Sequence, residues 1–194
     1  MKIQDKQFYD NDFDIDKYYE AQVKRHSLKH KKKRKIQHYL DCVEKIIDLV
    51  DNNCSMICLG TRNNHERDSF KKGLKNKDIN VFSLDISPLS GADYVMDFNS
   101  FPEEWHDKWD ILFSNSLDHA IDATETFEKW LNIVKTNGIL IIGFDKNIGE
   151  DNVGEADCCS FDQSHVDSFM KNNNKFQYID YVENSYVYYI LRKT

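Results

Sequence analysis

The apolar positions between residues 36 and 50 recur at the spacing of an amphipathic helix. They follow the i, i+3, i+4, i+7 pattern at Ile36, Tyr39, Leu40, Val43, Ile46, Ile47 and Val50. This spacing places them on one helical face, which we expect to be buried. The polar residues 51–53 end the pattern, and the sequence Ser-Met-Ile-Cys-Leu-Gly at residues 55–60 predicts a short buried strand that runs into a glycine turn.

Beyond that turn, short apolar runs alternate with stretches of helical or loop character. The runs predict strands at Val81–Asp85, Tyr94–Met96, Ile111–Ser114 and Ile139–Phe144. A helix is predicted over Ala123–Lys135, with Asn137-Gly138 as its end. Such alternation is typical of a doubly wound α/β fold, in which helices cover both faces of a mostly parallel sheet. The C-terminal ends of the strands then share one edge, where ligands bind.

The last part of the chain has a different pattern. Residues Phe176–Val182 and Tyr186–Arg192 alternate apolar and polar side chains around Glu183-Asn184-Ser185, which predicts an antiparallel hairpin. The 194 residues suffice for one ordinary domain. We place it at residues 36–194, after an N-terminal helical extension at residues 1–35. The aromatic stretch Phe8–Tyr19 of this extension is interpreted either as a lid over the ligand edge or as a segment packed against the sheet.

Charge is distributed unevenly along the chain. The formal net charge of −7 opposes attraction of nucleic acid to the surface as a whole. Residues 24–35, KRHSLKHKKKRK, nevertheless form the densest basic run. A run of this kind is usually a solvated helix face, and we favour that interpretation. The alternative is a binding surface for nucleic acid or an acidic glycan.

The sequence gives no indication of export or of a membrane. No stretch approaches the roughly 18 consecutive apolar residues of a membrane span, and MKIQDKQFYDNDFD lacks the apolar core of a secretory signal. The five cysteines have no zinc-ribbon spacing, so we expect reduced thiols and no bound metal. A cytoplasmic protein is therefore predicted.

Each of the first three predicted strands ends in a residue that an adenosyl cofactor requires. Gly60 allows close approach of the backbone after the first strand. Asp85 ends the second strand, where folds of this kind present an acid to a ribose, although a helix cap is the alternative. Asp97 ends the third strand, and Phe98 beside it offers a cover for the flat adenine ring.

The fourth predicted strand runs into a polar cluster, SNSLDHA, at residues 114–120. Asp118 and His119 are the candidate catalytic residues, because an imidazole titrates near neutral pH and a carboxylate orients or charges it. In the structural alternative, Asp118 caps the following helix and His119 packs beneath the cofactor. Their position at the ligand edge, more than their residue type, motivates the catalytic interpretation.

Taken in order, ICLGTRNNHE, VFSLDIS, ADYVMDF, WDILFSNSLDHA and NGILIIGF resemble the class I S-adenosylmethionine-dependent methyltransferases over about residues 36–194. The resemblance implies a seven-stranded sheet in which the terminal hairpin supplies the only antiparallel strand. It also implies the cofactor-binding residues: Gly60 and Thr61 beside the methionine, Asp85 at the ribose, Asp97 with Phe98 at the adenine, Asn115 and Ser116 facing the sulfonium, and Ile86 as a further contact.

The glycine turn departs from the pattern of that family, which usually has two further glycines where this chain has Arg62 and Asn64. We expect Arg62 to pair with the cofactor carboxylate and Glu66 to hold the cofactor ammonium or to brace the loop. A surface ion pair is the alternative for both. The Asn63-Asn64 step is expected to adopt the left-handed conformation that glycine would otherwise supply.

The sequence therefore predicts an S-adenosylmethionine-dependent methyltransferase with a small-molecule or sugar acceptor. Two alternatives stay open: a non-catalytic Rossmann-like binding module with an altered cofactor loop, and a methyltransferase that acts on RNA. A nicotinamide-dependent oxidoreductase requires a G-x-G-x-x-G pyrophosphate cradle after the first strand, and the sequence GTRNNH does not supply it.

Overall fold

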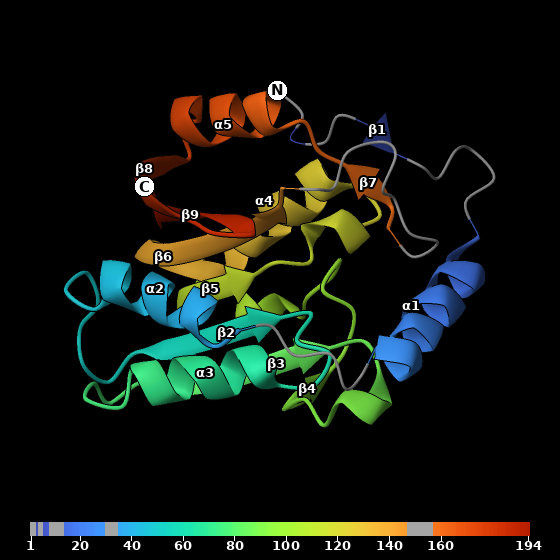
Figure 1. The fold of residues 1–194 in the computed structure, drawn as a ribbon, viewed down its shortest axis with the longest axis horizontal. Coiled ribbons are helices and arrows are strands. Elements are labelled where there is room, and N and C mark those ends of the chain that lie inside the picture. Colours follow the sequence, from blue (N-terminus) through green and yellow to red (C-terminus); the bar gives the residue numbers. More distant parts are fainter. Residues whose placement is uncertain (1–2, 4–5, 8–13, 30–34, 147–156) are drawn as a thin grey trace.

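A seven-stranded sheet forms the centre of the computed structural model, which describes residues 3, 6–7, 14–29, 35–146 and 157–194 (Figure 1). In spatial order the strands are β4 (Tyr94–Val95), β3 (Asn80–Asp85), β2 (Ser55–Leu59), β5 (Trp109–Ser114), β6 (Val134–Asp145), β9 (Tyr186–Lys193) and β8 (Phe176–Glu183). The first five are parallel, whereas β9 pairs antiparallel with both β6 and β8. The predicted doubly wound sheet with one antiparallel strand in a terminal hairpin is confirmed.

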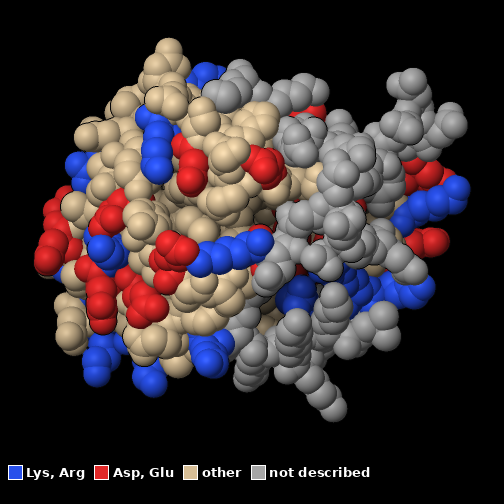
Figure 2. All heavy atoms as spheres, turned by 45° about the horizontal axis from the view of Figure 1, so that its top comes forward, with Lys and Arg blue, Asp and Glu red and all other residues tan. Residues whose placement is uncertain are grey.

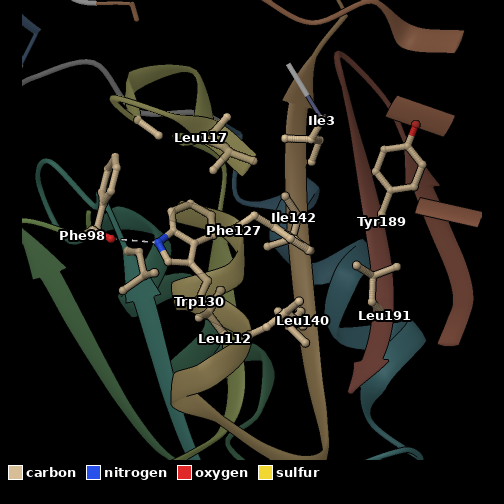
Figure 3. Close-up of a cluster of buried hydrophobic side chains, with 14 of the residues drawn as sticks. Ile3, Phe98, Leu112, Leu117, Phe127, Trp130, Leu140, Ile142, Tyr189 and Leu191 are labelled. Carbon is tan, nitrogen blue, oxygen red and sulfur yellow. Dashed lines mark hydrogen bonds between the residues drawn. The ribbon is translucent and has the colours of Figure 1, made fainter. Parts of the chain in front are cut away.

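Helices cover both faces of the sheet, which is why its central strands are apolar on both sides (Figure 1). The helices α2 (Gln37–Ile46) and α3 (His65–Gly73) pack on one face, and α4 (Ala123–Ile133) and α5 (Gln163–Asn172) pack on the other. Trp130 of α4 is fully buried, and its Nε1 donates to the Phe98 carbonyl at 3.0 Å (Figure 3). This bond fixes the loop after β4, where the site lies.

The chain direction places the ligand edge between β2 and β5. From β2 the chain continues to β3 and β4 on one side, and it then crosses to β5 and β6 on the other side. A switch of this kind opens a crevice at the C-terminal ends of the two central strands. Figure 1 shows α1 (Ile15–Lys29) standing at these ends, apart from the two helical layers.

Short elements complete this edge. Two 3₁₀ helices follow strands at this edge, η1 (Pro88–Ser90) after β3 and η3 (Leu117–His119) after β5, whereas a third, η2 (Glu103–Trp105), comes just before β5. A separate two-stranded sheet joins β1 (Lys6–Gln7) to β7 (Cys159–Ser160). It brings an N-terminal segment and the chain after β6 to the same edge. Neither this small sheet nor α5 was predicted from the sequence.

The structure corrects the predicted ends of several elements. Helix α2 ends at Ile46, not at Val50, and β4 is limited to Tyr94–Val95. The prediction that Asn137-Gly138 ends α4 is wrong, because α4 ends at Ile133 and Val134 already pairs with Trp109 of β5. Asn137, at φ +64°, lies inside β6, where the pairing with β5 shifts register.

Parts of two predicted segments, residues 8–13 of the aromatic stretch and 30–34 of the basic run, lie outside the described residues. Lys24 and Arg25, at the start of that run, belong to α1. On the described surface in Figure 2, acidic and basic side chains are interspersed. Among the described helices, none combines the length and the apolar composition that crossing a membrane requires.

Candidate active site

The turn after β2 brings backbone close to the crevice. Gly60 has φ +70°, and its amide donates to the Leu84 carbonyl of β3 at 2.8 Å. A Cβ atom at this position would lie 2.8 Å from both Cβ and Oγ of Ser116, which follows β5. Only glycine fits this geometry, because a side chain would meet both an unfavourable backbone conformation and a steric clash.

The loop that continues from Gly60 is built without the further glycines of the family pattern. Arg62 has φ +47° and Asn64 has φ +59°, so the predicted left-handed conformation is confirmed for Asn64 and also occurs at Arg62. Asn64 is fixed by its Nδ2, which donates to the Gly91 carbonyl at 2.7 Å. Asp85 holds the other end of the loop, because its Oδ2 accepts from the Arg62 amide at 2.8 Å.

Asp85 lies at the end of β3 and is 6% exposed. Its Oδ1 accepts a hydrogen bond from the Ser87 amide at 2.8 Å, in addition to the bond from Arg62 to Oδ2. Each carboxylate oxygen can accept a second bond. The side chain therefore fixes two loops and still presents acceptor capacity to the crevice that it lines.

Asp97 and Phe98 form the neighbouring wall. The Asp97 Oδ1 accepts from the amide and the side chain of Asn99 at 2.8 and 2.7 Å, and its Oδ2 accepts from the Tyr19 hydroxyl at 3.1 Å. Phe98 packs edge-on against Trp130, with 5.5 Å between ring centroids (Figure 3). The wall thus combines a fixed carboxylate with a buried aromatic ring.

On the opposite side of the crevice, His119 of η3 lies between two carboxylates. Its Nδ1 is 3.3 Å from Asp157 Oδ1, and its Nε2 is 3.8 Å from Asp118 Oδ2. Among the described residues, these three form a group whose ligand-type atoms lie within 4.8 Å of one another. Such a group is able to hold a metal ion, but here the Arg25 Nη1 lies 2.5 Å from Asp157 Oδ1 and supplies positive charge.

All these parts border one pocket at the C-terminal ends of the parallel strands. It encloses about 490 Å³ of empty space, part of which is open solvent. The lining residues are Tyr18, Gln22, Arg25, Gly60, Arg62, Asp85, Ile86, Asp97, Phe98, Ser116 and His119. The crevice of the doubly wound sheet is therefore a chemically varied pocket with both acidic and basic side chains.

Helix α1 covers this pocket with one face. Tyr18, Gln22 and Arg25 follow the i, i+4, i+7 spacing and all line it. Tyr18 is 1% exposed, and its hydroxyl donates to the His119 carbonyl at 3.2 Å. Burial and the nearby Asp97 raise the pKa of Tyr18, so the hydroxyl keeps its proton and remains a donor.

Most of the residues predicted from the sequence line this pocket, but four do not. Thr61 is buried in the turn, and Asn115 is buried between Ser116 and Gly143. Glu66 lies in the core under α2, where its Oε1 accepts from the Tyr39 hydroxyl at 3.1 Å. Asp118 contacts His119 without lining the pocket. The cofactor roles of Thr61, Asn115 and Glu66 and the catalytic role of Asp118 stay predictions.

Tyr18 belongs to the stretch Phe8–Tyr19, one interpretation of which was a lid over this edge, and three further residues of the site, Gln22, Arg25 and Asp157, were missed. Tyr18, Gln22 and Arg25 carry a signal in their helical spacing, which places them on one face of the extension. Asp157 carries none, because no local pattern connects it with His119, 38 positions earlier in the chain. Only the tertiary structure brings these two side chains together.

Comparison with known proteins finds likeness in fold. No family model and no curated protein matches the sequence. A chain from the complex of the Haloferax volcanii methyltransferase activator Trm112 with a proposed methyltransferase is 13% identical, with a TM-score of 0.61 over 90% of this chain and 97% of its own. A SAM-dependent methyltransferase from Aquifex aeolicus is 14% identical, with a TM-score of 0.57 over 93% and 98%.

The present chain has the class I methyltransferase fold. Within this fold, the pocket lies at the C-terminal ends of the parallel strands, beside the switch between β2 and β5. The [4+2]-cyclase SpnF is also similar, with 12% identity and a TM-score of 0.60 over 79% of each chain. One fold therefore carries more than one reaction, and the function has to be argued from the residues of the pocket.

Proposed function

We propose that the chain binds S-adenosylmethionine in this pocket and transfers its methyl group to an acceptor. The observation that carries the proposal is the convergence of Gly60, Asp85 and the Asp97–Phe98 pair on one pocket. These residues come from three different strand ends. Together they provide the close backbone approach, the ribose acceptor and the adenine wall that an adenosyl group requires.

Charge and shape support the fit of the cofactor. Gly60 borders the pocket without a side chain, which suits the methionine end, and Arg62 at the same turn offers a guanidinium to its carboxylate. Asp85 retains acceptor capacity for ribose hydroxyls. Ile86 and Phe98 both line the pocket and provide apolar surface for adenine.

When bound, S-adenosylmethionine supplies an activated methyl group, so the protein mainly has to position the acceptor and exclude water. Helix α1 contributes to this exclusion, because its Tyr18 and Arg25 line one side of the pocket. The acceptor atom would take the methyl group with its lone pair as the bond from the methyl group to the sulfonium breaks and leaves a thioether, and a hydroxyl or neutral amine acceptor would lose a proton. His119 is placed to take this proton.

For the acceptor, we favour a small molecule or a sugar over RNA. The described pocket is a crevice in the sheet edge that α1 borders on one side, and not an extended basic groove of the kind that RNA requires. Arg25, which belongs to the basic run, is 19% exposed and paired with Asp157, so its charge serves the site and not a surface patch. The five cysteines are all free, as a reducing compartment requires, and we propose that the protein acts in the cytoplasm.

Calorimetric titration of the full chain with S-adenosylmethionine, S-adenosylhomocysteine and NAD tests the proposal. We expect saturable binding of the first two ligands and none of NAD, because the turn lacks a pyrophosphate cradle. Absence of both heat and thermal stabilisation with the two adenosyl ligands would overturn the proposal in favour of a non-catalytic module. Binding of NAD alone would favour an oxidoreductase.

A further inference from the structure

Two carboxylates flank the His119 imidazole, and they are not equivalent. Asp157 Oδ1 is 3.3 Å from Nδ1, at ion-pair distance and close to hydrogen-bond range, whereas Asp118 Oδ2 is 3.8 Å from Nε2 and well beyond that range. The Asp157 side chain is 4% exposed and the Asp118 side chain is 11% exposed. A buried carboxylate is costly unless it is paired, so the position of Asp157 indicates a specific interaction.

Asp157 is held in place from both sides. On one side, Arg25 of α1 places its Nη1 2.5 Å from the same Oδ1 atom. The next residue, Cys158, is fastened to η3, because its amide donates to the Asp118 carbonyl at 2.7 Å and its Sγ donates to the His119 carbonyl at 3.3 Å. The three segments that meet at His119 are therefore locked together by bonds to its backbone as well as to its ring.

The geometry points to Asp157 as the positioning residue of His119. We propose that it selects the tautomer with the proton on Nδ1 and leaves Nε2 unprotonated, and that Arg25 holds Asp157 in that position. The inference rests on the proposed function, in which His119 takes a proton from the acceptor. A carboxylate only accepts hydrogen bonds, so Nδ1 must carry the proton, and a neutral imidazole has just one.

This arrangement has a consequence for the role of α1. Arg25 belongs to the helix that covers the pocket, and its charge compensates the buried Asp157 carboxylate. If Asp157 moves with Arg25, His119 is oriented only when α1 is in place over the pocket. The position of α1 then determines both whether the pocket is covered and whether the His119 imidazole is oriented.

Long-range ¹H–¹⁵N correlation spectra of the ¹⁵N-histidine-labelled full chain report the tautomer of each imidazole. At a pH at which His119 is neutral, we expect a pyridine-type signal from Nε2 and a pyrrole-type signal from Nδ1 in the wild-type protein. The opposite assignment would overturn the proposal without any variant. In Asp157→Ala, the Nδ1 proton loses its acceptor, and we expect His119 to shift toward the Nε2-protonated tautomer.

Two controls keep the result specific. His106, 65% exposed and 3.0 Å from Asp107 through Nδ1, should give the same signals in the wild-type and Asp157→Ala proteins. Asp118→Asn should leave the Nδ1-protonated tautomer of His119 unchanged, because Asp118 faces Nε2 beyond bonding distance. A tautomer that responds to Asp118→Asn but not to Asp157→Ala would assign positioning to Asp118 and overturn the proposal.

The spectra are recorded without cofactor or acceptor, so they are independent of the calorimetric test. A chain that binds no S-adenosylmethionine but shows the expected tautomers would overturn the proposed function and keep the role of Asp157. A chain that binds the cofactor but has the Nε2-protonated tautomer in the wild type would keep the proposed function and overturn the role of Asp157. Arg25→Gln should weaken the preference of His119 for the Nδ1-protonated tautomer, and an unchanged ratio would remove Arg25 from the arrangement.

Discussion

An aspartate has a different role at each end of the parallel strands. At the C-terminal ends, Asp85 fixes two loop amides and still borders the pocket. At the N-terminal ends, Asp110 of β5 accepts from the amide and hydroxyl of Ser55 at 2.8 and 2.9 Å and from Lys135 Nζ at 2.7 Å. Asp110 thus ties three neighbouring strands together and does not line the pocket that Asp85 borders.

The difference shows that strand direction, and not residue type, separates function from stability in this fold. The loops at the C-terminal ends carry left-handed residues and a pocket, whereas Asp110 joins β2, β5 and β6 where these strands begin. Removal of a pocket side chain at the first end should change binding or catalysis, whereas removal of Asp110 at the second end should change stability alone. The following predictions test this separation, from the largest expected effect to the smallest.

His119→Ala should lower the rate of methyl transfer to a known acceptor by about 10²–10⁴-fold, because the acceptor proton loses its base. Cofactor affinity should stay within a few fold, and the pH profile should lose its lower limb. Single-turnover kinetics measures the chemical step directly. The matched control is His106→Ala, just before the N-terminal end of β5, which should keep the wild-type rate. An unchanged rate in His119→Ala would show that His119 is not the base and that the protein acts only by positioning the acceptor.

Gly60→Ala should destabilise the protein far more than Gly91→Ala. Both glycines have positive φ, +70° and +66°, so both variants share a backbone cost of about 1 kcal/mol. A Cβ at Gly91 would meet Asn64 Nδ2 at an ordinary 3.7 Å, whereas at Gly60 it would meet Ser116 at 2.8 Å. The clash adds about 1–3 kcal/mol to the loss of unfolding free energy. Urea unfolding measures both variants, and equal losses would show that the turn tolerates a side chain.

Asp85→Ala should weaken S-adenosylmethionine binding by about 1.5–3 kcal/mol, or roughly ten- to hundredfold in affinity, because charged hydrogen bonds are lost. Asp110→Ala removes the equivalent side chain at the other end of the sheet and should leave affinity unchanged. Calorimetry on both variants gives the comparison. Equal weakening by the two would mean that Asp85 acts only through stability.

The contribution of Asp110 to stability should depend on pH. Partial burial opposes its ionisation, but the bonds from Lys135 and Ser55 outweigh this and hold its pKa below 3.8. A carboxyl with a lowered pKa in the folded state stabilises above 3.8, and this contribution is lost as pH falls through the folded-state pKa. Asp110→Asn should therefore cost about 1 kcal/mol at pH 7 and progressively less below pH 4.

Urea unfolding of the wild type and of Asp110→Asn between pH 7 and pH 3 measures this convergence. The exposed Asp78→Asn offers a matched control that should not change the free energy of unfolding at any pH. A difference between wild type and Asp110→Asn that stays constant to pH 3 would contradict the assignment of the effect to the carboxylate charge.

Neutralising Lys31, Lys32, Lys33 and Arg34 should have the smallest effect, because a run of like charges must be solvated. The melting temperature should stay nearly unchanged. If a polyanionic acceptor docks on the basic run, its binding should weaken and become less dependent on salt. Binding of RNA that does not respond to salt would count against that docking site.

The pocket residues at the strand ends can be found from the sequence, because the end of a strand is a local feature. An apolar run followed by Gly60 or Asp85 is recognisable without knowledge of the rest of the chain. The left-handed Asn64 follows from the conformational preference of asparagine, whereas the left-handed Arg62 does not, because it is imposed by the bond from its amide to Asp85.

The surroundings of His119 could not be predicted from the sequence, because they are formed by contacts between segments that lie far apart in the chain. His119 was found by its position after a strand, but Asp157 reaches it only because β7 pairs with β1 and Cys158 bonds to η3. The end of α4 was misplaced because Val134 is captured by pairing with Trp109, and no residue there signals a stop. Contacts between distant segments decided both cases.

The most direct test of the central claim is to locate the bound cofactor. Titration of the ¹⁵N-labelled chain with S-adenosylhomocysteine should shift the backbone amide signals of Gly60, Arg62, Ile86 and Phe98, which border the pocket. The amide signals of Ser55 and Asp110, at the other end of the sheet, should stay in place. An unchanged spectrum, or shifts confined to residues away from the pocket, would contradict the assignment of this crevice as the S-adenosylmethionine site.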